Sequence, residues 1–233
     1  MCNTDTVSFI AWSPNTPSIS DPEIIARLVE RWRVLGYRLT QGLAWPFDAP
    51  DNLITDGDAI HQRIVDVCDL SKRRRTLNLW HAPLEFSFRI TRQSLTSGAT
   101  WTLFAEIDTL MGPNNDFGES NAASLIHVIQ STLEVLPTLY GCLFSTQMPP
   151  SDEQVLGFIV NTVYPVNYFG EEYVRRVGAE KLRSSPAWSV REVRRGMLIV
   201  PGLRAMYGGD LAALRALQLQ VFGNQDIGLV ELT

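Results

Sequence analysis

The sequence contains few residues of the types that stabilise small folds from outside a hydrophobic core. Among its 233 residues are three cysteines, Cys2, Cys68 and Cys142, which are far apart and form no CxxC pair. This excludes a disulfide framework and a four-cysteine zinc site, so we expect each thiol to be buried or incidental. With 45% hydrophobic residues, a chain of this length can bury a sizeable core instead.

The sequence also lacks the motifs that identify common active sites. The three histidines, His61, His81 and His127, form no HExxH motif. EF-hand spacing, a GxSxG elbow, a P-loop and a GxGxxG turn before a helix are likewise missing from the sequence. Residue chemistry alone therefore predicts no catalytic residue, no bound metal and no cofactor.

Basic residues are in the minority, and lysine is the rarer of them. The chain has 20 basic and 25 acidic residues, a net charge of −5, and its only lysines are Lys72 and Lys181. Residues 1–170 carry a net charge of −7, whereas residues 171–215 carry +4. The overall acidity argues against non-specific nucleic-acid binding, which needs a basic face, and it permits a basic protein partner.

No hydrophobic run reaches the roughly 20 residues that a membrane-spanning helix needs. The N-terminus has neither a basic segment nor a long apolar run, so a secretory signal peptide is not expected. We therefore expect no membrane association and a cytoplasmic location. The oligomeric state is left open.

Hydrophobic periodicity predicts alternating strands and helices in the first half of the chain. Strands are expected at 6–12, 84–91, 101–110 and 139–146, and the last three in one antiparallel sheet. A helix is expected between Ser20 and Gly36, because five apolar residues share one helical face: Ile24, Ile25, Leu28, Val29 and Trp32. A second helix is expected at 121–136, and residues 46–58 are expected to form an exposed loop.

The second half predicts helices around one strand pair. Helices are expected at 151–162, at 167–182 and from Asp210 to Val221, with a stop at Gly223. A strand pair is expected at 190–200 and a short strand at 227–232. Together these patterns predict an α+β fold, an antiparallel sheet packed with several helices, in one domain over residues 1–233. The proline-rich segment 147–150 is a weak candidate boundary between two lobes.

Acidic residues form the only pattern that suggests chemistry. Glu106 and Asp108 are two apart in a predicted strand and so share one of its faces, with Asp116 and Glu119 nearby. Paired carboxylates of this kind can hold a divalent metal or act as acid and base, although an ordinary solvated strand face is the preferred explanation. Further acidic residues lie in the 46–58 segment: Asp48, Asp51, Asp56 and Asp58.

The stretch from residue 136 to 200 has a recognisable order of motifs. It contains Leu136-Pro137, Tyr140-Gly141, Tyr164-Pro165, Asn167-Tyr168-Phe169-Gly170, Tyr173-Val174, Gly178, Lys181-Leu182, Ser185-Pro186-Ala187-Trp188, Val190–Val193 and Gly196-Met197-Leu198-Ile199. This order resembles the bacterial immunity proteins of polymorphic and type VI secretion toxin systems, especially the immunity protein 52-like group. The resemblance covers a quarter to a third of the chain.

The resemblance implies a non-enzymatic immunity protein that binds and neutralises a cognate protein toxin. In that case the acidic residues are expected to contact a basic toxin surface: Asp48, Asp51, Asp56, Asp58, Asp108, Asp116 and Glu119. The alternative is a hydrolase or metal-binding protein that uses the acidic face of Glu106 and Asp108. A third possibility is a structural or phage-defence component.

Overall fold

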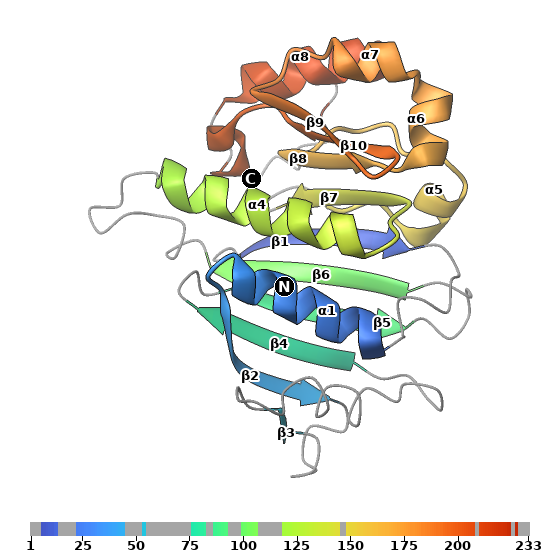
Figure 1. Cartoon of the computed structure of the whole chain (residues 1–233). Helices are drawn as coiled ribbons and strands as arrows, with labels where there is room; N and C mark the ends of the chain where they lie inside the picture. The colour runs from blue at the N-terminus through green and yellow to red at the C-terminus, as the bar shows by residue number, and fades with distance from the viewer. Residues whose placement is uncertain are drawn as a thin grey trace.

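One antiparallel sheet runs through the whole chain (Figure 1). The computed structural model describes residues 6–13, 22–44, 53–54, 76–82, 86–92, 99–106, 118–144, 148–207, 210–224 and 227. Within these ranges ten strands form the sheet, in the order β3-β2-β4-β5-β6-β1-β7-β8-β10-β9. Every neighbouring pair is antiparallel. The α+β class predicted from the sequence is therefore confirmed.

The strands are β1 (Thr6–Ser13), β2 (Arg38–Ala44), β3 (Leu53–Ile54), β4 (Thr76–Ala82), β5 (Phe86–Arg92), β6 (Ala99–Glu106), β7 (Tyr140–Phe144), β8 (Val166–Phe169), β9 (Ser189–Val193) and β10 (Gly196–Val200). The helices are α1 (Pro22–Val34), α4 (Glu119–Val135), α5 (Asp152–Leu156), α6 (Glu171–Val177), α7 (Ala179–Arg183), the 3₁₀ turn η4 (Leu203–Tyr207) and α8 (Leu211–Phe222).

Helices α1 and α4 cover one face of the sheet. The apolar side of α1 is fully inside, and Leu28 and Trp32 have no exposed surface. The Trp32 ring meets the edges or faces of Phe86 and Phe88 on β5, with ring centroids 5.4 and 5.1 Å away. Such contacts add to the area that the rings bury. The predicted inward face of this helix is confirmed.

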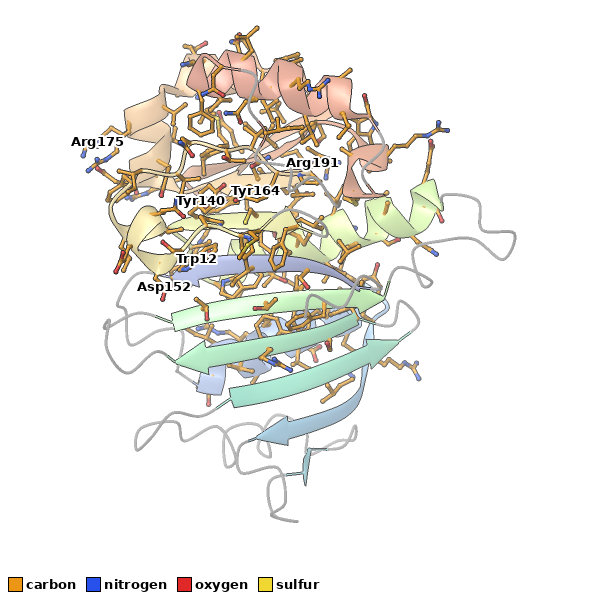
Figure 2. The ribbon with its side chains drawn as sticks, turned by 180° about the vertical axis from the view of Figure 1, so that it is seen from behind. Trp12, Tyr140, Asp152, Tyr164, Arg175 and Arg191 are labelled. Carbon is orange, nitrogen blue, oxygen red and sulfur yellow. The ribbon has the colours of Figure 1, made fainter. Side chains whose placement is uncertain are left out.

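On the opposite face the described helices, α5 to α8, cover the second half of the sheet. Its core contains aromatic residues from several strands, among them Tyr140 and Phe169, and the free, buried thiol of Cys142. Burial raises the pKa of that thiol well above its usual value, so Cys142 is held neutral. The Trp12 indole Nε1 donates a hydrogen bond of 2.7 Å to the Asp152 carboxylate of α5, and Figure 2 shows this pair at the edge of the helix cover.

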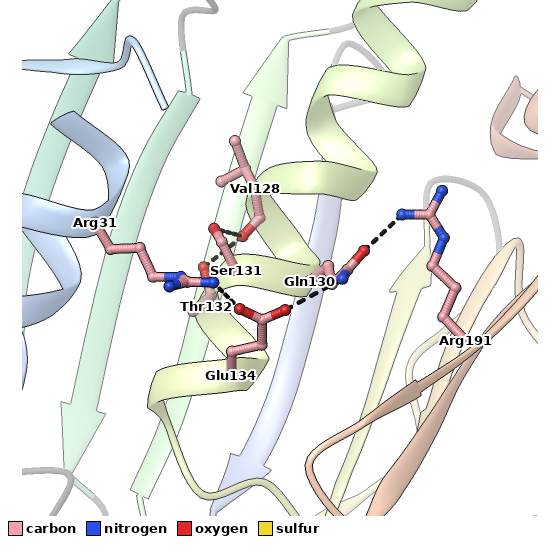
Figure 3. Close-up of polar contacts among 7 residues, drawn as sticks. All are labelled: Arg31, Val128, Gln130, Ser131, Thr132, Glu134 and Arg191. Atoms are coloured by element: carbon pink, nitrogen blue, oxygen red, sulfur yellow. Dashed lines mark hydrogen bonds and ion pairs between the residues drawn. The ribbon is translucent and has the colours of Figure 1, made fainter. Parts of the chain in front are cut away.

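A polar network crosses the outer surface of α4 and connects both parts of the sheet (Figure 3). Arg31 of α1 pairs with Glu134, which also accepts a 3.2 Å hydrogen bond from Gln130. Gln130 in turn accepts a 2.6 Å hydrogen bond from Arg191 of β9. Because these side chains are partly solvated, the network contributes little free energy and mainly orients α4 between α1 and β9.

The structure confirms most of the predicted elements in the first half and adds three strands. β5, β6 and β7 share the sheet as expected, with β1 placed between β6 and β7. Strands β2 and β4 were not predicted. Leu53 and Ile54, inside the predicted 46–58 loop, form β3 because they pair with Leu43 and Gly42 of β2. The rest of that segment lies outside the described residues.

Two helix predictions in the second half are wrong in part. The 151–162 helix ends at Leu156, because Gly157 follows and Phe158 has a φ of 56°, which breaks the helical path. The 167–182 segment begins as strand β8, since all four residues of β8 are buried between β7 and β10. Only then do α6 and α7 follow, separated at Gly178, whose φ of 105° suits glycine.

The remaining predictions in this half hold where the structure describes them. The β9–β10 pair lies within the predicted 190–200 region apart from Ser189, and it turns at Arg194 and Arg195. Helix α8 is capped by Asp210, whose side chain accepts from the Ala213 N–H, and it ends at Gly223 with a φ of 78°. The predicted strand at 227–232 lies outside the described residues except for Ile227.

Replacing Leu28 by Ala is expected to lower the free energy of unfolding by about 2–5 kcal/mol, because it leaves a cavity under the sheet. Val34→Ala on the same helix is the matched control, since that side chain is 77% exposed and its loss is expected to change stability by less than about 0.5 kcal/mol. Urea denaturation measures both. Equal effects of the two variants would contradict the assignment of the buried face.

Tyr140→Phe is expected to leave the fold intact and raise the free energy of unfolding by about 1 kcal/mol or more. The Tyr140 hydroxyl is buried and has no hydrogen-bond partner among the described residues, and leaving such a group unsatisfied costs about 1–3 kcal/mol. The ring contacts to Trp12, Phe169 and Tyr173 are retained in the variant. A loss of stability on thermal or urea unfolding would show that the hydroxyl has a partner.

Candidate partner-binding site

The structure places only one of the seven acidic residues expected to contact a partner. Glu119 is the first residue of α4 and is exposed, where its charge favours the helix N-terminus. The others lie outside the described residues: Asp48, Asp51, Asp56, Asp58, Asp108 and Asp116. The same holds for the side chain of Glu106, whose backbone ends β6. The acidic face proposed from Glu106 and Asp108 therefore stays a prediction.

Half of the sheet has one face that none of the described helices covers (Figure 2). The strand register puts Ser87, Arg89, Thr102 and Phe104 on this face. Arg89 is exposed and the other three are half-buried. We call these four residues the open sheet face. Transient protein interfaces have the same mixed polar and apolar composition as the rest of a protein surface, so this composition is compatible with partner binding.

The Arg89 guanidinium lies over the Phe104 ring, with its central carbon 5.1 Å from the ring centroid. This cation–π contact fixes an otherwise flexible side chain in the middle of the open sheet face. An ordered arginine beside an aromatic ring is a common arrangement among residues that dominate protein–protein affinity.

A cleft of about 660 Å³ lies elsewhere on the molecule, where three connections meet. Its walls are the link between α4 and β7, the start of α6, and the β9–β10 turn. The lining residues are Pro137, Thr138, Leu139, Tyr168, Glu171, Glu172, Arg194 and Arg195. Pockets of this size commonly hold a small ligand or a few residues of a partner. We call this feature the arginine cleft.

Two glycines let the walls of the arginine cleft approach closely. A Cβ at Gly170 would lie 2.5 Å from the carbonyl oxygens of Thr138 and Leu139. One at Gly196 would lie 2.5 Å from the Phe169 carbonyl oxygen. Only glycine avoids these collisions with backbone, so the positions of α6 and of the β9–β10 turn relative to β8 depend on both residues.

The acids of the cleft are already paired with arginines. Glu172 accepts hydrogen bonds from Arg175 and Arg176, and these hold the pKa of its carboxyl at about 2. Glu171 pairs with Arg195 at 3.3 Å, which joins the start of α6 to the β9–β10 turn. Arg194 is exposed and forms no ion pair with any carboxylate in the part of the chain that the structure describes.

Arg194 also has an unusual backbone. Its φ of 54° lies in the left-handed region, which side chains other than glycine rarely adopt. It is the first of the two turn residues between Val193 and Gly196, and Arg195 has no positive φ. Hairpin turns with positive φ at the first central residue alone are of type II′, where glycine is preferred.

Tyr168 forms the floor of the arginine cleft. Its hydroxyl donates a 3.3 Å hydrogen bond to the Val193 carbonyl oxygen. Desolvation raises the pKa of this hydroxyl to about 12, although the nearby Arg194 guanidinium lowers it. Tyr168 is therefore neutral at physiological pH and can donate a hydrogen bond but carries no charge.

Sequence reasoning did not identify the arginine cleft as a site. It placed Tyr168, Gly170 and Gly196 in the recognised order of motifs and treated them as scaffold. The sequence feature that could have indicated this site is the pair Arg194 and Arg195 at a two-residue turn, because glycine is the expected residue at such a turn. The positive charge of residues 171–215 was a second signal.

Within the described ranges no three His, Cys, Asp or Glu residues lie close enough together to hold a metal ion. None of the helices described is long and apolar enough to cross a bilayer.

Comparison with known proteins gives one informative result. No protein-family profile matches the sequence, and no curated protein matches it. Among solved structures, the chain is similar to the Pseudomonas aeruginosa T6SS protein PA0821, with a TM-score of 0.58 and 12% sequence identity. The similarity covers 95% of this chain and 74% of the other. At this identity the two proteins share a fold, and function does not follow from that alone.

High pH is expected to destabilise the fold through Tyr168. Because its pKa is about 12 in the folded chain and about 10 when unfolded, the folded state holds this proton more tightly. Its contribution to stability is complete below pH of about 10 and is lost as the pH rises toward 12. We expect Tyr168→Phe to lose less stability than the wild type over this interval in urea titrations. Parallel pH profiles of the two proteins would contradict the role of Tyr168.

Proposed function

We propose that this chain is a non-enzymatic immunity protein of a type VI secretion system, which binds a cognate toxin and neutralises it. The observation that carries the proposal is the shared fold with a T6SS protein over 95% of the chain. It agrees with the order of motifs between residues 136 and 200, which suggested an immunity protein independently of any structure.

The described surfaces suit a protein-binding role. The open sheet face presents an Arg89–Phe104 pair, and the arginine cleft is a concave feature with uncompensated positive charge. Binding energy in protein complexes is concentrated in such aromatic and arginine residues, while surrounding charges accelerate association and fix orientation.

We further propose that the acidic residues between 48 and 58 and between 108 and 119 attract a basic region of the toxin. Together they hold Asp48, Asp51, Asp56, Asp58, Asp108, Asp116 and Glu119. Opposite charge speeds the encounter of two proteins more than it strengthens the final complex, and salt screens the effect.

The test is co-expression with the protein encoded by the adjacent gene. If that protein is a toxin, its expression alone is expected to arrest growth of a bacterial host, and co-expression of this chain is expected to restore it. The purified proteins are expected to form a stable complex in calorimetry. Failure to bind and to restore growth would contradict the proposal.

Neutralising Asp56 and Asp58 together to Asn is expected to slow association about threefold at low salt, and less at high salt. Glu30→Gln with Glu153→Gln is the control, because these exposed acids lie on α1 and α5. Unchanged association at every salt concentration would show that the acidic segment does not steer the toxin.

A separate measurement distinguishes the alternative enzyme or metal-binding function. A divalent metal held by Glu106 and Asp108 would raise the thermal unfolding midpoint progressively as the metal concentration increases, whereas a chain that binds only a toxin would show no metal-dependent shift. Loss of that shift in Glu106→Gln would favour the alternative.

A further inference from the structure

We propose that the arginine cleft is a recognition site for one carboxylate side chain, an Asp or Glu on a projecting segment of the protein partner. Arg194 would bind this carboxylate. The inference rests on the proposed function for the identity of the partner, and it assigns the partner an acidic contact in addition to the basic one.

The charge of the cleft favours an anionic ligand. Four arginines stand at the cleft and on the adjacent turn of α6, namely Arg175, Arg176, Arg194 and Arg195, against two acids, Glu171 and Glu172. Glu172 is held by two of them and Glu171 by a third. An excess of two positive charges remains, and Arg194 is the one without a carboxylate among the described residues. A carboxylate can accept two parallel hydrogen bonds from such a guanidinium.

The acids at the cleft wall favour a single carboxylate over a phosphate. The first turn of α6 brings Glu171 and Glu172 to the cleft wall, and these would repel a polyanion. The N–H of Gly170, at the same helix end, is already donated to the Leu139 carbonyl oxygen at 2.9 Å. A single carboxylate can reach Arg194 on the opposite wall, while Pro137, Leu139 and the Tyr168 ring supply apolar surface for its neighbours.

The backbone of Arg194 also favours a binding role for this residue. A glycine at this turn position would adopt a φ of 54° without strain, yet the chain has an arginine there. Residues held in rare backbone conformations cluster at functional sites. The turn itself is fixed, because Gly196 packs directly against β8 and Arg195 is tied to Glu171. The exposed Arg194 side chain is therefore held at the cleft by a rigid hairpin.

A single substitution at this turn is expected to weaken partner binding without lowering the stability of the fold. Arg194→Gly removes the guanidinium and relieves the strained φ, so the thermal unfolding midpoint is expected to be equal to or higher than that of the wild type. Affinity for the adjacent gene's product, measured by calorimetry, is expected to fall about tenfold, as for loss of a charged hydrogen-bonding partner. Arg215→Gln on α8, another exposed arginine, is the matched control and is expected to change neither value.

A second probe makes the inference testable apart from the proposed function. It is a short fluorescent peptide with one central glutamate between apolar residues, compared with the same peptide carrying glutamine. Anisotropy is expected to show binding of the glutamate peptide to the wild type, and at least tenfold weaker binding of the glutamine peptide and of Arg194→Gly. Inorganic phosphate and ATP are expected not to compete.

If the adjacent gene's product binds Arg194→Gly as tightly as the wild type, the cleft inference is wrong and the immunity proposal stands. If that product does not bind the wild type at all, the immunity proposal is wrong and the peptide pair decides the cleft. Equal binding of the glutamate and glutamine peptides, or competition by phosphate or ATP, would overturn the carboxylate site.

Discussion

The backbone pairing of β1 on both of its edges is the constraint on which the rest of the structure depends. This strand hydrogen-bonds to β6 along its whole length and to β7 over five residues. It thereby joins the strands formed by residues 38–106 to those formed by residues 140–200 into one sheet. Its side chains alternate accordingly. Phe9 lies in the core beneath α1 and α4, and Trp12 lies in the opposite core beneath α5. A strand with two buried faces tolerates no shift in register, because a slip of one residue would exchange the contents of both cores.

The unequal helix cover follows from this arrangement. One face of the sheet is covered along its length by α1 and α4, which Arg31, Glu134, Gln130 and Arg191 connect across their outer surfaces. Among the described residues, the helices on the other face lie beside β7, β8 and β10 and reach β1 at Trp12. The region left without a described helix carries the Arg89–Phe104 pair. The arginine cleft lies where α4 ends and its link to β7 begins, and its floor residue Tyr168 belongs to the core beneath α1 and α4.

At the arginine cleft, the same few residues determine the backbone conformation and the charge available for binding. Gly170 and Gly196 allow close approach of α6 and the β9–β10 turn to the strand between them, and this approach defines the cleft walls. Within the same turn Arg194 occupies a conformation that favours glycine. Glycine therefore occupies the positions where two segments are in contact, and an arginine occupies the turn position from which a charged side chain projects. If the partner presents both acidic and basic contacts, orientation as well as affinity would be set by charge.

Much of the fold could be predicted from the sequence, because periodic burial of apolar residues is a local signal. The inward face of α1, the alternation of Phe86, Phe88 and Ile90 on β5, and the caps of α8 all followed from spacing and from capping residues. Only the tertiary structure decided those elements whose conformation depends on the strands packed beside them. Residues 166–169 have apolar content compatible with a helix, yet they form β8 because β7 and β10 bury them on both sides. The arginine cleft likewise brings together residues 137–139, 168–172 and 194–195, whose proximity depends on strand order. Local sequence specifies which residues avoid water and which ends are capped, whereas strand order depends on contacts between distant segments that no single stretch of sequence encodes.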